Sequence, residues 1–68
     1  MKQFKDILKE KRKALGLTQY EVADALGTSQ SRVASWELGQ HFPGFLNLAD
    51  LADIFRCSVD ELMGRKTQ

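Results

Sequence analysis

The positions of apolar residues along the chain predict helices and no strands. In residues 2–15 and again in residues 45–55, apolar side chains recur at spacings of three and four, which places them on one face of a helix. In the first segment this face holds Phe4, Leu8, Leu15 and the stem of Lys11. In the second it holds Phe45, Leu48, Leu51, Ala52 and Phe55. Both helices therefore need other elements to cover their apolar faces.

Two short helices between these segments are marked by the residues at their ends. Thr18 and Glu21 have the spacing of a capping box, and Gly27 is suited to end the helix that they begin. A further helix starts at Ser29 and runs to about residue 38, just before Gly39. The residues expected to face inward are Val22, Ala23, Leu26, Val33 and Trp36.

The last helix is short and follows a second capping pattern. Ser58 and Glu61 have the same spacing as the first pair, and Gly64 ends the segment. With the break at Pro43-Gly44, the pattern predicts five helices in one compact all-α domain, residues 1–64. Residues 65–68 are expected to form a disordered tail.

Three small or β-branched residues indicate how the helices at 18–26 and 29–38 meet. Ala23 allows a close crossing, Gly27 can adopt the positive φ of a tight turn, and Val33 fills the angle between the helices. Two helices joined by such a turn form a helix-turn-helix, a motif that places its second helix in the major groove of DNA. The second helix begins with Gln30, Ser31 and Arg32, which are side chains suited to bases or phosphates.

Charge is unevenly distributed although the net charge is only +1. Six lysines and arginines lie in the first 13 residues, where Asp6 and Glu10 are the only acids, whereas residues 44–63 carry four acids against Arg56. The basic end could contact phosphates, or it could be the solvated face of an amphipathic helix. One Cys excludes an internal disulfide, and no run approaches the ~20 apolar residues of a membrane span. We expect a cytoplasmic protein with no membrane association.

Beyond these inferences, the chain resembles the Cro and repressor-type helix-turn-helix proteins, also called the xenobiotic-response-element family. The resemblance covers residues 4–64. It rests on Leu8-x3-Arg12-x2-Leu15-Gly-Leu-Thr-Gln19, Val22-Ala23-x2-Leu26-Gly27-x-Ser29-Gln30-Ser31-x-Val33-x2-Trp36-Glu37-x-Gly39, Pro43, Leu51-Ala-Asp-Ile-Phe55 and Ser58-Val-Asp-Glu-Leu62. It implies a five-helix, lambda-repressor-like DNA-binding domain whose third helix enters the major groove.

The resemblance also implies roles for individual residues. Gln19 would grip a phosphate, and the bases would be read by Gln30, Ser31 and, one turn later, Ser35. Chemistry agrees, because glutamine can pair with adenine through two hydrogen bonds and serine can donate or accept. Arg32 could read guanine or hold a phosphate, and the phosphate is the preferred interpretation. Further phosphate candidates are the helix-start residues Thr18 and Ser29 and the loop residues Gln40 and His41.

Other matched positions are structural. Arg12 and Glu37 correspond to an ion pair that ties the first helix to the end of the third. Cys57 corresponds to a buried core position. The chain departs from the family in its loop 40–44, which carries no fixed charge, and at Arg56, where either a left-handed residue or an adjusted turn is required.

These observations predict a sequence-specific, double-stranded DNA-binding transcriptional regulator. We expect a repressor that binds a palindromic operator as a homodimer, paired through the helix at 58–64 and the ends of the helix at 45–55. Apolar residues off the core faces would form this surface: Ile7, Phe42, Leu46, Ile54 and Met63. The alternative is a protein-interaction module on the same fold, an antitoxin or an adaptor with a protein partner. No nucleophile and base pair suggests catalysis, and no cofactor or metal is expected.

Overall fold

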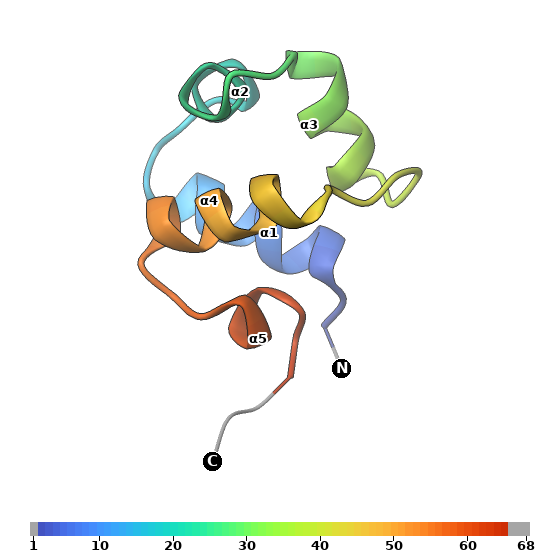
Figure 1. Ribbon diagram of the computed structural model, residues 1–68, viewed down its shortest axis with the longest axis vertical. Coiled ribbons are helices and arrows are strands. Elements are labelled where there is room, and N and C mark those ends of the chain that lie inside the picture. Colours follow the sequence, from blue (N-terminus) through green and yellow to red (C-terminus); the bar gives the residue numbers. More distant parts are fainter. Residues whose placement is uncertain (1, 66–68) are drawn as a thin grey trace.

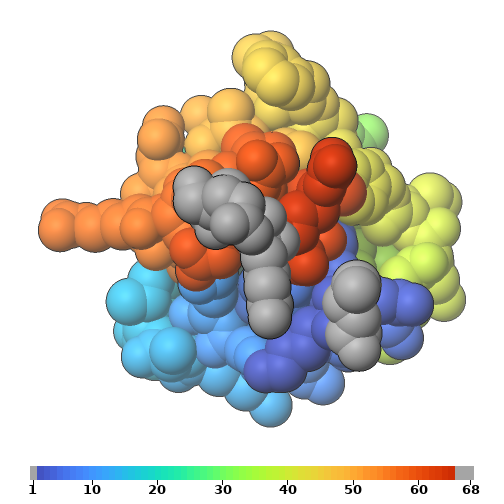
Figure 2. All heavy atoms as spheres, turned by 90° about the horizontal axis from the view of Figure 1, so that it is seen from below, coloured from blue at the N-terminus to red at the C-terminus, as the bar shows by residue number. Residues whose placement is uncertain are grey.

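The protein consists of five helices, described here by a computed structural model for residues 2–65. They are α1 (Phe4–Ala14), α2 (Gln19–Leu26), α3 (Gln30–Glu37), α4 (Phe45–Phe55) and α5 (Val59–Leu62). No strand occurs among the described residues, so the predicted all-α, five-helix fold is confirmed. In Figure 1, α2 and α3 lie together at one end of the molecule, α1 and α4 cross its middle, and α5 lies at the other end. Seen from that other end, α5 sits between α1 and α4 (Figure 2).

Each helix contributes one large, fully buried side chain to a single core. These are Leu8, Val22, Val33, Leu51 and Leu62, in chain order. Trp36 and Ala23 are also buried, as the sequence predicts. Because the five helices share this core, the position of α3 is set by its direct packing against α1 and α2 and by the core that they share with α4 and α5.

Two residues assigned to apolar helix faces lie at the surface instead. Leu15 is 55% exposed, because α1 ends at Ala14 and Leu15 already belongs to the turn that follows. Phe45 is 78% exposed, because it is the first residue of α4 and its side chain leans back beyond the helix end. The buried face of α1 is completed by Arg12, a charged residue. The first helix also begins at Phe4, two residues later than predicted.

Two half-buried residues were wrongly expected to lie off the core. Ile7 and Met63 both pack against the buried cluster. Phe42 and Leu46, which were also expected at the apolar surface, are exposed. Phe42 packs on Phe4 with ring centroids 4.8 Å apart. One area of exposed apolar surface therefore lies at the start of α4 and in the preceding loop.

The end of α4 and the start of α5 show how the chain turns between these two helices. Arg56 adopts the left-handed conformation, with φ of 53°, so the chain accepts a strained residue where glycine would be free. The capping pattern of α5 is only half formed, since Ser58 accepts from the Glu61 N–H but the Glu61 carboxylate pairs with Lys11. Of the predicted tail 65–68, residues 66–68 lie outside the described residues.

Candidate nucleic-acid interface

The α2–turn–α3 unit is held by caps at both ends of α2 and at the start of α3. At the start of α2, Thr18 Oγ1 accepts from the Glu21 N–H at 3.0 Å, and Glu21 Oε1 accepts from the Thr18 N–H at 2.8 Å. Gly27 ends α2 with φ of 71°, and Ser29 Oγ caps α3 by accepting from the Arg32 N–H at 3.3 Å. Ala23 and Val33 are buried where the two helices meet. The helix-turn-helix geometry that these residues predict is therefore present.

The far end of α3 is tied to α1 by a buried ion pair. Arg12 Nε and Nη2 donate to the two carboxylate oxygens of Glu37 at 2.6 and 3.0 Å, a bidentate arrangement. Arg12 Nη1 also donates to the carbonyl of Leu17, just before α2, at 2.8 Å. The pair predicted from the sequence exists, and it joins α1, the start of α2 and the end of α3.

Two glutamines extend the hydrogen bonds of the Glu37 carboxylate to the surface. Gln19 Nε2 donates to Glu37 Oε1 at 3.0 Å, and Gln30 Nε2 donates to Gln19 Oε1 at a long 3.5 Å. A chain of side chains thus runs from buried Arg12 to Gln30 at the head of α3. It holds Gln19 and Gln30 side by side on one surface.

Hydrogen bonds keep Glu37 ionised. Burial opposes the charge, but hydrogen bonds from Arg12 and Gln19 and the positive charges of Arg12 and Lys9 outweigh it, so the pKa of Glu37 lies below its usual value. The pKa of Arg12 is raised by its hydrogen bonds to Glu37. Gln19 is therefore held by an ion pair in which both Arg12 and Glu37 are charged.

The side chains at the head of α3 differ in availability. Gln30, Ser31 and Arg32 are exposed. Ser35 is half-buried, and its hydroxyl donates to the Arg32 carbonyl at 2.7 Å, which leaves only its acceptor capacity free. Gln30 and Ser31 are thus better placed for an outside partner than Ser35.

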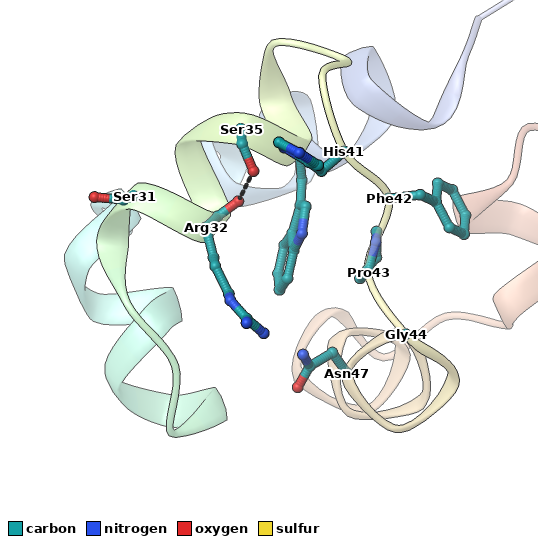
Figure 3. A pocket seen from close by; sticks show the side chains of 9 residues that line it. Ser31, Arg32, Ser35, His41, Phe42, Pro43, Gly44 and Asn47 are labelled. Atoms are coloured by element: carbon teal, nitrogen blue, oxygen red, sulfur yellow. Dashed lines mark hydrogen bonds between the residues drawn. The ribbon is translucent and has the colours of Figure 1, made fainter.

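A hollow of about 400 Å³ lies between α3, the loop 40–44 and the start of α4. In Figure 3, Arg32 and Asn47 extend into it from opposite sides, His41 lies at its rim, and Ser31 points away from it. Gly44 caps α4 without a side-chain hydrogen bond, so the first N–H groups of α4 have no capping side chain. The hollow combines a cation, amide groups and a helix start, a set of donors suited to an anion.

Asn47 was missed by the sequence analysis. Its signal is a polar residue in the otherwise apolar first turn of α4, close to the loop. Trp36 lines the same hollow from its buried side, and Gln40 lies exposed on the far side of the loop. The hollow thus brings together polar candidates from α3, the loop and α4, whereas Gln19 of α2 joins the surface through Gln30.

Within residues 2–65, no group of three His, Cys, Asp or Glu residues is placed to hold a metal ion. No helix in this range is long and apolar enough to span a membrane. Cys57 is half-buried against the core, and burial raises the pKa of its thiol.

Comparisons with known proteins place the chain in a family. The family model described as helix-turn-helix matches residues 8–62. The cryptic phage CTXphi transcriptional repressor RstR of Vibrio cholerae is 39% identical over 61 residues, 90% of this chain and 54% of RstR. The regulator AnsR of Bacillus subtilis is 41% identical over 63 residues, 93% of this chain and 54% of AnsR. The chain therefore spans about half the length of either relative.

Structural similarity agrees with the sequence matches. The phage P22 c2 repressor, solved in complex with a synthetic operator, superposes with a TM-score of 0.90 over 97% of this chain and 100% of that one. Its sequence is 24% identical, so this likeness bears on the fold alone. With the capped turn, the buried Arg12–Glu37 pair and the family match over most of its length, the chain belongs to the helix-turn-helix family of the Cro and repressor type.

Proposed function

We propose that this protein is a sequence-specific regulator of transcription that binds double-stranded DNA with α3 in the major groove. The observation that carries the proposal is the exposed head of α3, where Gln30 is held beside Gln19 by the chain of contacts from Arg12. A side chain held in place before binding loses less entropy when it contacts a base. Family membership and the regulators among the relatives support the same function.

Base reading falls to residues on the exposed side of α3. Gln30 would pair with adenine through its amide, and Ser31 would bond to a neighbouring base edge. Ser35 would take a lesser part, as an acceptor only, because its hydrogen is already bound to the Arg32 carbonyl.

Phosphates would be held on both sides of α3. On one side are Gln19 and the start of α2 at Thr18; on the other are Arg32, His41 and the uncapped start of α4 at Gly44. Ser29 and Gln40 would contribute at the edges. These contacts fix the register of the protein on the duplex and carry no sequence information themselves.

A homodimer would bring two copies of α3 to successive major grooves about 34 Å apart, matching a palindromic operator. Phe42, Phe45 and Leu46 are the exposed large apolar residues near the start of α4 and are candidates for the contact. Their exposed area is on the order of 400 Å², well short of the ~800 Å² that each partner of a stable complex usually buries. We therefore expect pairing to be weak in free solution and to be completed on DNA.

Regulation would consist of occupying a promoter. RstR is named a transcriptional repressor, and repression by occupancy requires no enzymatic step. We infer that the protein has no catalytic activity and that its output is set by its affinity for the operator.

The test is a selection of duplexes from a random pool at low salt, followed by sequencing. The proposal predicts an enriched palindromic site with half-sites about one helical turn apart. An enriched site without symmetry would refute the homodimer and keep the base reading. Absence of enrichment by folded protein would refute the proposal and favour the antitoxin or adaptor interpretation.

A further inference from the structure

The lysines of α1 divide into two groups according to their ion pairs. Lys2 pairs with Glu10 at 2.8 Å, and Lys11 pairs with Glu61 of α5. Within residues 2–65, Lys5, Lys9 and Lys13 have no carboxylate in ion-pair distance. The positive charge of these three side chains is therefore not neutralised by a direct partner in the described part of the chain.

These three lysines form a row at intervals of four residues. Four residues advance a helix by about 6 Å and rotate it by about 40°, so the row follows one flank of α1 for about 12 Å. We call Lys5, Lys9 and Lys13 the lysine row. Lys11 points to the opposite flank, toward α5.

The lysine row borders the proposed DNA-binding surface. A Cβ built on Gly39, directly after α3, would lie 2.9 Å from Cδ of Lys5, so the stem of Lys5 covers the end of α3. Lys9 is close enough to Glu37 for its charge to favour the ionised carboxylate. Glu37 holds Gln19, the proposed phosphate contact on that side. The row thus continues the surface that begins at Gln19 and Gln40.

We propose that the lysine row is an additional binding site for the sugar-phosphate backbone of duplex DNA, beside the strand that Gln19 contacts. The inference rests on the proposed function. A strand of DNA presents one charge per 3.4 Å along the axis, so a row about 12 Å long can serve several successive phosphates. The row supplies the fixed charge that the loop 40–44 lacks, and it does so without reading sequence.

Acidic side chains near the lysine row reduce its positive charge, and removing one of them offers a second test. Asp6 is exposed on the same part of α1, and Glu10 is engaged by Lys2. Removing the charge in Asp6→Asn should tighten binding to every duplex to a similar extent, and more strongly at low salt than at high salt.

The experiment measures the affinity for two fixed duplexes of different sequence, by fluorescence anisotropy, across a series of salt concentrations. For wild type, the logarithm of the binding constant falls linearly with that of salt, with a slope of about −0.9 per phosphate neutralised. The double variant Lys9→Gln with Lys13→Gln should have a slope shallower by about 2, and its preference between two sequences should be unchanged. Arg56→Gln is the control for the loss of a positive charge elsewhere, because it removes one exposed charge at the end of α4, away from α3 (Figure 1), and it should leave the slope unchanged.

The outcomes separate this inference from the proposed function. Wild-type protein that binds no duplex at low salt overturns both. If wild type binds and the salt slope of the double variant is unchanged, phosphate binding by the lysine row is refuted and the proposed function stands. The row would then face solvent or bind an acidic protein surface. Methylphosphonate substitution of single phosphates gives an independent check, since the inference predicts positions that weaken wild type and have no effect on the double variant.

Discussion

Arg12 and Glu37 form a bidentate ion pair between α1 and the last residue of α3, with side chains only 11% and 4% exposed. The pair is largely buried, and the Glu37 carboxylate also accepts a hydrogen bond from the side chain of Gln19. Burying one of these charges without the other is costly, which makes the pair a cooperative link between the scaffold and the proposed DNA-binding surface.

Replacing Glu37 with glutamine tests this link. Glu37→Gln keeps the shape but leaves the Arg12 charge buried without a carboxylate, so we expect a loss of about 3–5 kcal/mol in the free energy of unfolding. Urea unfolding followed by the fluorescence of Trp36, the single tryptophan, measures it. Glu10→Gln is the matched control, because it breaks the exposed pair with Lys2 and should barely move the midpoint. An equal loss of unfolding free energy in Glu37→Gln and Glu10→Gln would show that the Arg12–Glu37 pair is no more important for stability than an exposed pair.

The same carboxylate makes stability depend on pH in a defined direction. The pKa of Glu37 is lower in the folded state than its ordinary value of 4.5, so its contribution is complete above that value and is lost as pH falls toward the folded pKa. Wild-type stability should therefore drop below about pH 5, and Glu37→Gln should show a flatter profile there. Parallel profiles for the two proteins would show that Glu37 is not the group responsible.

Two glutamines are expected to differ in what they control. Gln30→Ala should cost about 1–3 kcal/mol on the preferred site and relax the choice of one base pair. Gln19→Ala should weaken binding to all duplexes, and because Gln19 also touches Gln30 it should relax specificity slightly. Competition titrations with the preferred duplex and single-base variants measure both. Identical specificity profiles for the two variants would refute this division.

The turn between α2 and α3 should fail through backbone strain and not through crowding. A Cβ at Gly27 would meet no atom within 4 Å, but φ is 71°, which L residues resist. We expect Gly27→Ala to cost about 1–2 kcal/mol, Gly27→Val to cost more and Gly27→Asn less. Thermal melts give this order. At Gly64 the Cβ would lie 2.5 Å from the Lys2 carbonyl, so there Asn should be no better tolerated than Ala.

Most of the fold could be predicted from caps, glycines and apolar spacing, because these signals are local. The bounds of α4, the caps at Thr18 and Ser29 and the left-handed Gly27 follow directly from such patterns. Leu15 was misplaced because the apolar periodicity continues past the end of α1, and Phe45 because burial in the first turn of α4 depends on which neighbours cover it. Helical spacing alone could not distinguish these positions.

The sequence indicated most residues of the candidate site, although not Asn47, and it did not indicate the contacts between them. The pairing of Arg12 with Glu37 was implied by the family resemblance, whereas the contacts of Glu37 with Gln19 and of Gln19 with Gln30 depend on how α1, α2 and α3 pack. Asn47 enters the hollow only because α4 begins beside α3. The charge of the first helix could not be interpreted until the structure separated the paired lysines from the lysine row.

If Gln30 reads a base in the major groove, replacing it should change which base is preferred. Duplex selection would be carried out in parallel with wild type and with Gln30→Arg. Arginine pairs with guanine through two hydrogen bonds, whereas glutamine pairs with adenine. We therefore expect A·T to become G·C at one position in each half-site, with all other positions retained. Two identical enriched sites, or changes scattered over the whole site, would contradict base reading by Gln30.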